Sequence, residues 1–146
     1  MGITIRPLTA ADHDQWEALF RAYIRFYEAH VADDVIAATW ERLIKGEDGF
    51  LALVAEEDGN RLVGIAHILF HRSTWSPTTY CYLEDLFVDI DTRRRGVGRA
   101  LIEAVYREAD NRGSTRTYWT TKADNARARR IYDRVANQSG FVQYRR

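Results

Sequence analysis

The sequence predicts a mixed α/β fold, in which a mostly antiparallel central sheet contains one parallel β-α-β crossover and carries helices on both faces. First, strand-like runs and helical stripes are interspersed along the 146 residues. Second, the turn signal Asp-Gly-Asn at 58–60 separates two β-rich runs, which is typical of an antiparallel hairpin. Third, a helical stripe between strand-like runs at 79–88 and 115–121 is long enough to connect parallel strands. One domain over residues 1–146 is expected, since the length suits a single core.

A short strand and two helices are expected first. Residues 3–6 alternate apolar and polar side chains, which is typical of a strand. Thr9, with an acid three residues later, is a typical helix N-cap. Helical spacing then continues to about Glu28, with apolar residues at Trp16, Leu19, Phe20 and Tyr23. A second stripe ends at Gly46 and comprises Val35, Ile36, Trp40, Leu43 and Ile44.

The rest of the chain alternates strands and helices. The expected strands lie at 50–56, 61–72, 79–88, 115–121 and 141–144. One helix is expected to begin at Val97 and end at Gly113. The last helix is expected to end near Gly140, and its apolar face comprises Ala128, Ile131, Tyr132 and Val135.

Composition excludes several classes of protein. The chain is 46% hydrophobic and 12% aromatic, which is too much for a disordered protein. No apolar run approaches the ~20 residues of a membrane span, and the first residues do not resemble a signal peptide. The single cysteine, Cys81, excludes an internal disulfide, and four scattered histidines do not predict a metal site. A cytoplasmic protein without a membrane partner is expected.

The formal net charge of zero hides an uneven distribution of charge. Residues 1–92 hold 16 acidic and 7 basic residues, whereas residues 93–146 hold 5 acidic and 14 basic residues. Such a split predicts two chemically different ligands, or one polyanion bound to the basic half.

The segment 93–99 reads Arg-Arg-Arg-Gly-Val-Gly-Arg, follows a strand and opens a helix. Glycine allows the backbone to approach a ligand closely, and the first turn of a helix presents N–H groups at the positive end of its dipole. Arginines add charge-assisted donors. These features predict a site for an anion of pyrophosphate size, although a tight turn with solvated arginines is the alternative. The segment lacks the ending of a P-loop and the third glycine of a dinucleotide fingerprint.

Two motifs resemble those of the GNAT N-acetyltransferase superfamily, and the resemblance covers essentially the whole chain. Residues 80–102 resemble its acetyl-CoA-binding segment, and Arg93, Gly96 and Gly98 match the element Arg/Gln-x-x-Gly-x-Gly/Ala. The family's helix Asn-x-x-Ala-x-x-x-Tyr is matched by Asn125, Ala128 and Tyr132. The run Leu-Glu-Asp-Leu-Phe-Val is most similar to the polyamine acetyltransferases and to the yeast-type group that acetylates histones, polyamines or D-amino acids.

The resemblance implies direct transfer of an acetyl group from acetyl-CoA to an amine in a ternary complex. The strands at 80–88 and 115–121 would splay apart, so that the pantetheine arm pairs with the freed edge. A backbone N–H there would polarise the thioester carbonyl. The residues expected to hold acetyl-CoA are Leu86, Phe87, Val88, Arg93, Arg94, Arg95, Gly96, Val97, Gly98, Arg99, Asn125, Ala128 and Tyr132.

Glu84 and Asp85 are adjacent acids in an otherwise apolar strand, and both are candidates to receive a cationic amine. Neighbouring side chains on a strand point to opposite faces, so one of the two is expected in the acceptor cleft. Glu84 matches the family position of a base that acts through water. A structural ion pair with an arginine is the alternative for either residue. Tyr27 and Glu28 resemble a substrate-contacting pair of the polyamine enzymes.

Tyr132 is the candidate general acid, because a phenol can protonate a departing thiolate whose pKa is near 8.5. A core tyrosine is the alternative. Asn125 is expected to contact the pantetheine arm, to cap the last helix, or to do both. His67, His71 and Cys81 are expected to be structural.

An N-acetyltransferase acting on a small cationic amine, or on a protein lysine, is the expected function. The acceptor cleft would be lined by Tyr23, Tyr27, Glu28, Asp33, Asp34 and Glu84. A catalytically inactive CoA-binding sensor of the same fold is the alternative. Nucleic acid is not an expected partner, because no recognition motif is present. A homodimer is expected, in which another subunit completes the sheet edge beside the last strand.

Overall fold

Five strands form one sheet in the computed structural model, which describes residues 2–92 and 96–146. The strands follow the chain in the order β1 (Thr4–Pro7), β2 (Phe50–Glu57), β3 (Arg61–Ser73), β4 (Ser76–Val88) and β5 (Arg116–Tyr118). Neighbouring strands are antiparallel except β4 and β5, which are parallel. The mixed sheet with a single parallel crossover is therefore confirmed.

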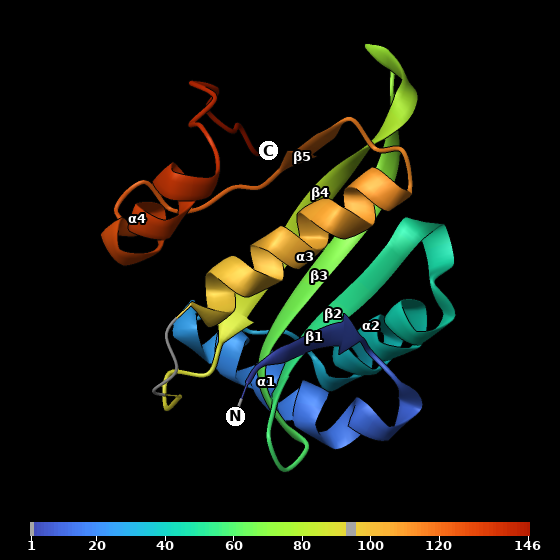
Figure 1. Ribbon diagram of the computed structural model, residues 1–146, viewed down its shortest axis with the longest axis vertical. Coiled ribbons are helices and arrows are strands. Elements are labelled where there is room, and N and C mark those ends of the chain that lie inside the picture. The colour runs from blue at the N-terminus through green and yellow to red at the C-terminus, as the bar shows by residue number, and fades with distance from the viewer. Residues whose placement is uncertain (1, 93–95) are drawn as a thin grey trace.

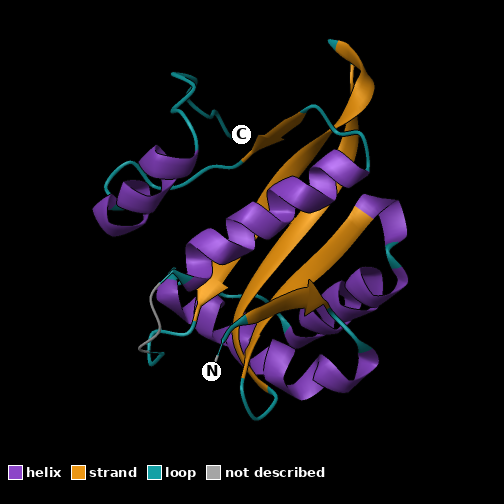
Figure 2. Cartoon of the chain, in the orientation of Figure 1, coloured by secondary structure: helices purple, strands orange, loops and turns teal. Residues whose placement is uncertain are grey.

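Helices cover both faces of this sheet (Figures 1 and 2). They are α1 (His13–Phe26), α2 (Asp33–Lys45), α3 (Val97–Asn111) and α4 (Ala126–Val135), with short 3₁₀ turns at Ala10–Asp12 and Glu47–Gly49. One core packs α3 against Val63, Ala66 and Ile68 of β3. The other packs α1 and α2 against Leu62 and Ile65 of the same strand. The apolar side chains of β3 therefore lie on both faces of the sheet, and a β-bulge at Val63, where β3 pairs with β2, lets Leu62 and Ile65 share one face. No helix in the described part of the chain is long and apolar enough to cross a membrane.

The junction between β1 and α1 is held by a buried carboxylate. Asp12 accepts hydrogen bonds from Nη1 of Arg6 at 2.7 Å, from Nη2 of Arg6 at 2.8 Å and from the Thr9 N–H at 2.8 Å. The Arg6 guanidinium holds the pKa of Asp12 well below its usual range, at about 2. The expected cap at Thr9 therefore opens a 3₁₀ turn, after which α1 begins.

The parallel pair β4–β5 is short. Its ladder joins Tyr80, Cys81 and Tyr82 to residues 116–118, and β4 continues to Val88 beyond it. Figure 1 shows the chain after β5 turning away from β4 toward α4. The expected separation of these two strands is confirmed, and it begins after Tyr82.

Three sequence predictions at the C-terminal end are corrected by the structure. The strand expected at 115–121 is reduced to Arg116–Tyr118. α4 ends at Val135 and not near Gly140. The strand expected at 141–144 does not form, and Phe141 and Tyr144 are about nine-tenths exposed. A strand requires a partner edge as well as a β-rich sequence, and this segment has no such partner among the described residues.

Candidate active site

A β-bulge distinguishes β4 where it leaves β5. His67 of β3 pairs with Asp85 and the next residue, Ile68, pairs with Leu83, so Glu84 is the extra residue. The bulge interrupts the alternation of side chains across β4. Burial and the charge of Asp85 raise the pKa of the Tyr23 phenol, and the charge of Glu84 adds to this. Which of the two carboxylates serves the acceptor cleft stays a prediction.

Asp85 lies at the end of a buried hydrogen-bond chain. Nε1–H of Trp16 donates to Nε2 of His67 at 2.9 Å, and Nδ1 of His67 lies 2.8 Å from Oδ2 of Asp85. Trp16 and His67 are buried, whereas the Asp85 side chain is 17% exposed. The phenol of Tyr23 also hydrogen-bonds to Asp85. The Asp85 carboxylate is therefore held on its buried side by His67 and is partly exposed to solvent.

Tyr27 and Tyr132 come from opposite ends of the sequence and influence each other. Burial and the charge of Asp85 raise the pKa of Tyr27. Burial is the main reason that the pKa of Tyr132 rises to about 12, and Tyr27 adds to it. Nζ of Lys122 lies 5.6 Å from the centre of the Tyr27 ring, which ties the end of α1 to the segment before α4. The structure thus links Tyr27 and Glu84 to Asp85, and Tyr132 to Tyr27, while their catalytic roles stay predictions.

The Glu84 side chain can reach solvent although neighbouring protein atoms partly surround it. Its side chain is exposed, yet neighbouring protein atoms and the charge of Asp85 raise its pKa. His67 and Arg145 act in the opposite direction. A carboxyl group of this kind can take up a proton at a higher pH than an ordinary glutamate does.

Packing orients Tyr132 on the inner face of α4. Its ring lies edge-on to Trp119, with centroids 5.3 Å apart, and it packs against the core under α3 together with Ile131. The hydroxyl of Tyr106 donates to the Val135 carbonyl at 2.8 Å and fastens the end of α4 to α3. The ring of Tyr132 therefore packs as the alternative of a core tyrosine requires, and its role as general acid stays a prediction.

Asn125 caps α4, as one of its two expected roles requires. Its Oδ1 accepts from the Ala128 N–H at 3.4 Å, and its Nδ2 donates to the Thr121 hydroxyl at 3.2 Å. These bonds fix the turn that leads into α4 and so position Tyr132 two turns later. The role of Asn125 and Ala128 in binding pantetheine stays a prediction.

The start of α3 has the geometry that an anion site requires. Gly96 has φ 82°, and the first bond of the helix joins the Ala100 N–H to the Gly96 carbonyl at 2.9 Å. The amides of residues 97–99 precede that bond and have no acceptor within the helix. Val97 is buried in the core, and the Arg99 side chain is half exposed. Arg93, Arg94 and Arg95 lie outside the described residues.

The backbone of Leu86, Phe87 and Val88 runs along the part of β4 that β5 does not cover. On its other edge this segment pairs with β3, where Leu86 lies opposite Ala66 and Val88 lies opposite Gly64. The side chain of Phe87 packs into the core with α1. One edge of this backbone segment is therefore directed toward the gap between the diverging chains, as the prediction of an added pantetheine strand requires.

Three of the expected acceptor residues lie after the end of α1 and at the start of α2. Glu28 is exposed and adopts φ 54°, just after α1 ends. Asp33 accepts a hydrogen bond from Nη2 of Arg21 at 3.1 Å in the first turn of α2, where Asp34 is also exposed. Their roles as acceptor-cleft residues stay predictions.

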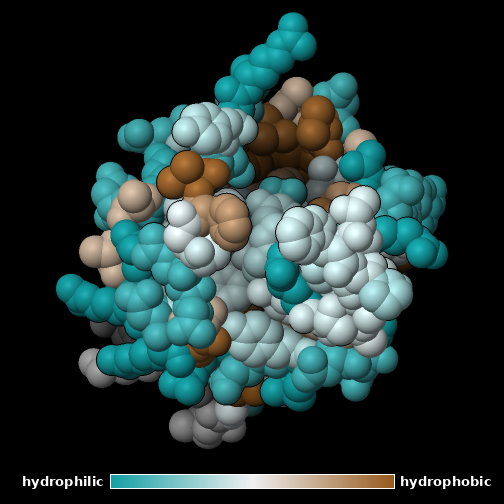
Figure 3. Space-filling view, turned by 90° about the horizontal axis from the view of Figure 1, so that it is seen from above, coloured by the Kyte–Doolittle hydropathy of each residue, from teal (hydrophilic) through white to brown (hydrophobic). Residues whose placement is uncertain are grey.

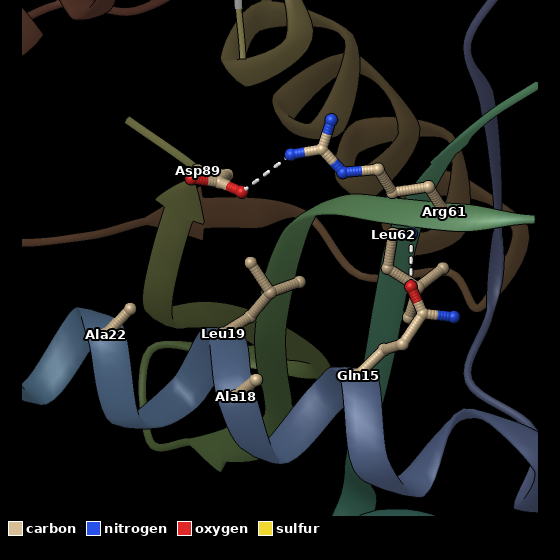
Figure 4. A pocket seen from close by; sticks show the side chains of 7 residues that line it. All are labelled: Gln15, Ala18, Leu19, Ala22, Arg61, Leu62 and Asp89. Atoms are coloured by element: carbon tan, nitrogen blue, oxygen red, sulfur yellow. Dashed lines mark hydrogen bonds and ion pairs between the residues drawn. The ribbon is translucent and has the colours of Figure 1, made fainter. Parts of the chain in front are cut away.

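The surface grooves of the described chain lie elsewhere. The molecular surface is hollowed on one side, with hydrophobic side chains at the base of the hollow (Figure 3). A groove of about 180 Å³ lies between α1 and the start of β3. Figure 4 shows it crossed by Arg61 and Asp89, which form an ion pair 3.2 Å long, and by the bond from the Leu62 N–H to Gln15. None of the residues predicted for acetyl transfer lines this groove, and its charges neutralise each other.

Sequence reasoning missed the hydrogen bond from His67 to Asp85, although it predicted a structural histidine. No motif marks this histidine, and the bond to Asp85 depends on the pairing of strands whose residues are 18 positions apart. The signal that could have found it is a histidine within the most apolar strand, because a buried polar side chain requires a partner.

Comparison with known proteins identifies the family. Residues 16–136 match the model of the acetyltransferase (GNAT) family. The chain is 32% identical over 145 residues to the D-amino-acid N-acetyltransferase HPA3 of Saccharomyces cerevisiae, with 99% of this chain and 90% of that protein covered. It is 31% identical over 91 residues to a thialysine N-epsilon-acetyltransferase of Caenorhabditis elegans, with 62% and 54% covered.

Solved structures share the fold. AAC(6')-Iy in complex with the bisubstrate analogue CoA-S-monomethyl-acetylneamine superposes with a TM-score of 0.85 at 23% identity, covering 100% of this chain and 98% of that one. The overall fold of this chain is thus a known architecture. This chain belongs to the acetyltransferase (GNAT) family and is an N-acetyltransferase.

Proposed function

We propose that this enzyme transfers the acetyl group of acetyl-CoA to a cationic primary amine in a ternary complex. The observation that carries the proposal is the pair of carboxylates, Glu84 and Asp85, at the point where β4 parts from β5. Two carboxylates attract an ammonium ion, and the protonated phenol of Tyr132 would serve a leaving thiolate. The named relatives, which acetylate D-amino acids and thialysine, are consistent with an amine acceptor.

Acetyl-CoA fits the donor groups of the chain. The left-handed Gly96 opens α3, and the amides of residues 97–99 precede the helical ladder, which suits a pyrophosphate. The free edge of residues 86–88 suits an extended pantetheine arm, which would pair as an added strand. The bound cosubstrate supplies the activated acetyl thioester. A backbone N–H of this edge would then polarise its carbonyl.

In this proposal Glu84 acts as the general base and Tyr132 acts as the general acid. The nitrogen of the amine forms a bond to the acetyl carbon while the bond from that carbon to sulfur breaks. Before the attack, Glu84 receives through a water molecule the proton that turns the ammonium into a nucleophilic amine, because its carboxyl group is exposed and its pKa is raised. Tyr132 donates its phenolic proton to the sulfur, because a pKa of about 12 keeps that proton in place at neutral pH. The nitrogen loses its second proton once the bond to the acetyl carbon has formed, and that proton restores the Tyr132 phenol.

An acceptor screen tests the proposal directly. Release of the CoA thiol is measured with acetyl-CoA alone and with a polyamine, a D-amino acid, an aminoglycoside or a lysine peptide. We expect amine-dependent release with at least one class, and a slower release at low amine concentration in Asp85→Asn. Tight binding of CoA without release for any amine would instead favour a sensor.

We also propose a homodimer, because the segment after α4 exposes Phe141, Val142 and Tyr144. Apolar side chains this exposed are typical of a surface that another chain covers. In the proposed dimer, this segment of one copy pairs with the open edge of β5 in the other copy, which covers the apolar side chains. Sedimentation velocity on the wild-type chain and on the double variant Phe141→Ser/Tyr144→Ser tests whether the chain forms this dimer. We expect a dimer in the first and a monomer in the second, and a monomeric wild type would contradict it.

A further inference from the structure

We propose that His67 is a positioning residue for the acceptor, and that it acts by holding Asp85 as a carboxylate whose charge no protein cation neutralises. The inference rests on the proposed function, since it concerns how the same site takes hold of an amine. It starts from the buried chain that runs from Trp16 through His67 to Asp85.

The chain fixes the protonation of the imidazole. An indole N–H can only donate, so Nε2 of His67 accepts and carries no proton. The one proton of the neutral ring is therefore on Nδ1, which donates to Oδ2 of Asp85 at 2.8 Å. Protonation of Nε2 would place two N–H groups against each other in a region where His67 is 2% exposed. Trp16 thus keeps the histidine neutral.

A neutral histidine leaves the charge of Asp85 available. Its other donor, the Tyr23 phenol, is neutral as well, because burial and Asp85 itself raise the pKa of that phenol. Among the described residues, His67 is the sole basic side chain within ion-pair distance of Asp85. Tyr23, Tyr27 and Glu84 also act on or near this carboxylate. Two cations lie further out: Lys122 stands 5.6 Å from the centre of the Tyr27 ring, and Arg145 acts on Glu84. In the part of the chain that the structure describes, neither of them forms an ion pair with Asp85.

The imidazole of His67 is also held rigidly by its neighbours. Rings from α1 enclose the imidazole: Phe20 lies edge-on with centroids 5.1 Å apart, and Trp16 lies at 5.9 Å. A side chain packed in this way has little freedom to rotate, so the carboxylate is held at one place. A group that is already oriented before the amine binds lowers the entropy cost of binding and of acetyl transfer. His67 would thus raise the affinity for the amine without touching it.

Two amide substitutions separate the two bonds of His67. The Asn side chain of His67→Asn places an N–H near the position of Nδ1, so it keeps the donor to Asp85 and loses the acceptor for Trp16. The longer side chain of His67→Gln places its amide near Nε2, so it keeps the acceptor and loses the donor. His13→Gln at the exposed start of α1 is the matched control, because His13 packs against Trp40 and has no bond to Asp85.

The test measures KM for the amine, KM for acetyl-CoA and kcat for these variants and for Asp85→Asn. We expect His67→Gln to raise KM for the amine about tenfold, as loss of a hydrogen bond to a charged group does. KM for acetyl-CoA should change by less than about twofold, and His67→Asn and His13→Gln should stay within about threefold of wild type for the amine. In the Asp85→Asn background, His67→Gln should have no further effect, because its action passes through Asp85.

Several results would overturn the inference. Equal losses in His67→Asn and His67→Gln, a parallel rise of both KM values, or additive effects of His67→Gln and Asp85→Asn would each show a merely structural histidine. If His67→Gln does not fold, His67→Ala and its Asp85→Asn double variant decide, since His67→Ala also removes the donor to Asp85 and additivity there has the same meaning. A wild-type protein without amine-dependent activity would sink the proposed function, whereas an active wild type with an unaffected His67→Gln would sink this inference alone.

Discussion

Tyr132 unites a packing role and a chemical role in one side chain. Its ring packs against Trp119 and the core under α3, and the same burial raises the pKa of its phenol to about 12. We expect Tyr132→Phe to lower kcat by about 100-fold or more, because a general acid contributes on this scale, and to leave the dissociation constant of CoA within about twofold. Steady-state kinetics and calorimetric titration with CoA measure the two quantities. An unchanged kcat would remove Tyr132 from the acid role.

Glu84 gives the enzyme a pH dependence with a defined sign. Burial and the charge of Asp85 raise its pKa above the ordinary value of 4.5, so the carboxylate that acts as base is lost as the pH falls through that raised pKa. We expect kcat to fall on the acid side with an apparent pKa above 4.5. Glu84→Gln should lower kcat and abolish that acid limb. The pH profile of kcat decides the matter, and a limb that survives in Glu84→Gln belongs to another group.

At the scale of single residues, the sequence predicted the reacting groups but not the residues that hold them in place. Glu84, Asp85, Tyr27 and Tyr132 are recognisable because they sit in motifs of fixed spacing. The structure links Tyr27 and Glu84 to Asp85, and Tyr132 to Tyr27, while their roles stay predictions. The bond from His67 to Asp85 has no such spacing, since it follows from the register of β3 on β4 and from the bulge at Glu84.

The close approach of α3 to the sheet depends on a glycine in β3. A Cβ built on Gly64 would lie 3.0 Å from Cδ1 of Leu101 and 3.2 Å from the Phe87 carbonyl oxygen. We expect Gly64→Ala to reduce the free energy of unfolding by roughly 1 kcal/mol or more, since overpacking costs more than the alanine gains. Gly98→Ala is the control, because its Cβ would meet Val88 at an ordinary 3.7 Å. Urea denaturation of both variants measures this, and equal stabilities would contradict it.

Elements with strong local signals were predictable. The turn at Gly59 and Asn60 adopts positive φ and joins β2 to β3, and α3 begins at Val97 as its apolar face indicates. Residues 141–144 have the composition of a strand and lack a partner edge, which no local pattern reveals. The length of β5 was overestimated for the same reason, because its pairing with β4 ends where the two chains part.

The uneven charge of the whole molecule separates two kinds of ligand. The acidic half carries Glu84 and Asp85, and the basic half carries the start of α3 and the arginines before it. We expect binding of CoA to weaken about tenfold between 0.05 and 0.5 M salt, because salt screens exposed charges. Binding of pantetheine, which lacks the phosphates, should change by less than about twofold. Calorimetric titrations measure both, and equal salt dependence for the two ligands would refute a role for this charge.

The central claim is direct transfer of the acetyl group to an amine at the pair of carboxylates on β4. The most direct measurement is a single-turnover experiment, in which enzyme loaded with one equivalent of acetyl-CoA is mixed with the amine selected by the screen. Mass spectrometry then follows the acetylated amine, the free CoA and the protein over time. We predict that acetylated amine and free CoA appear together, in equal amounts, while the mass of the protein does not change. Free CoA without acetylated amine, or an acetylated protein that forms before the amine is added, would contradict direct transfer.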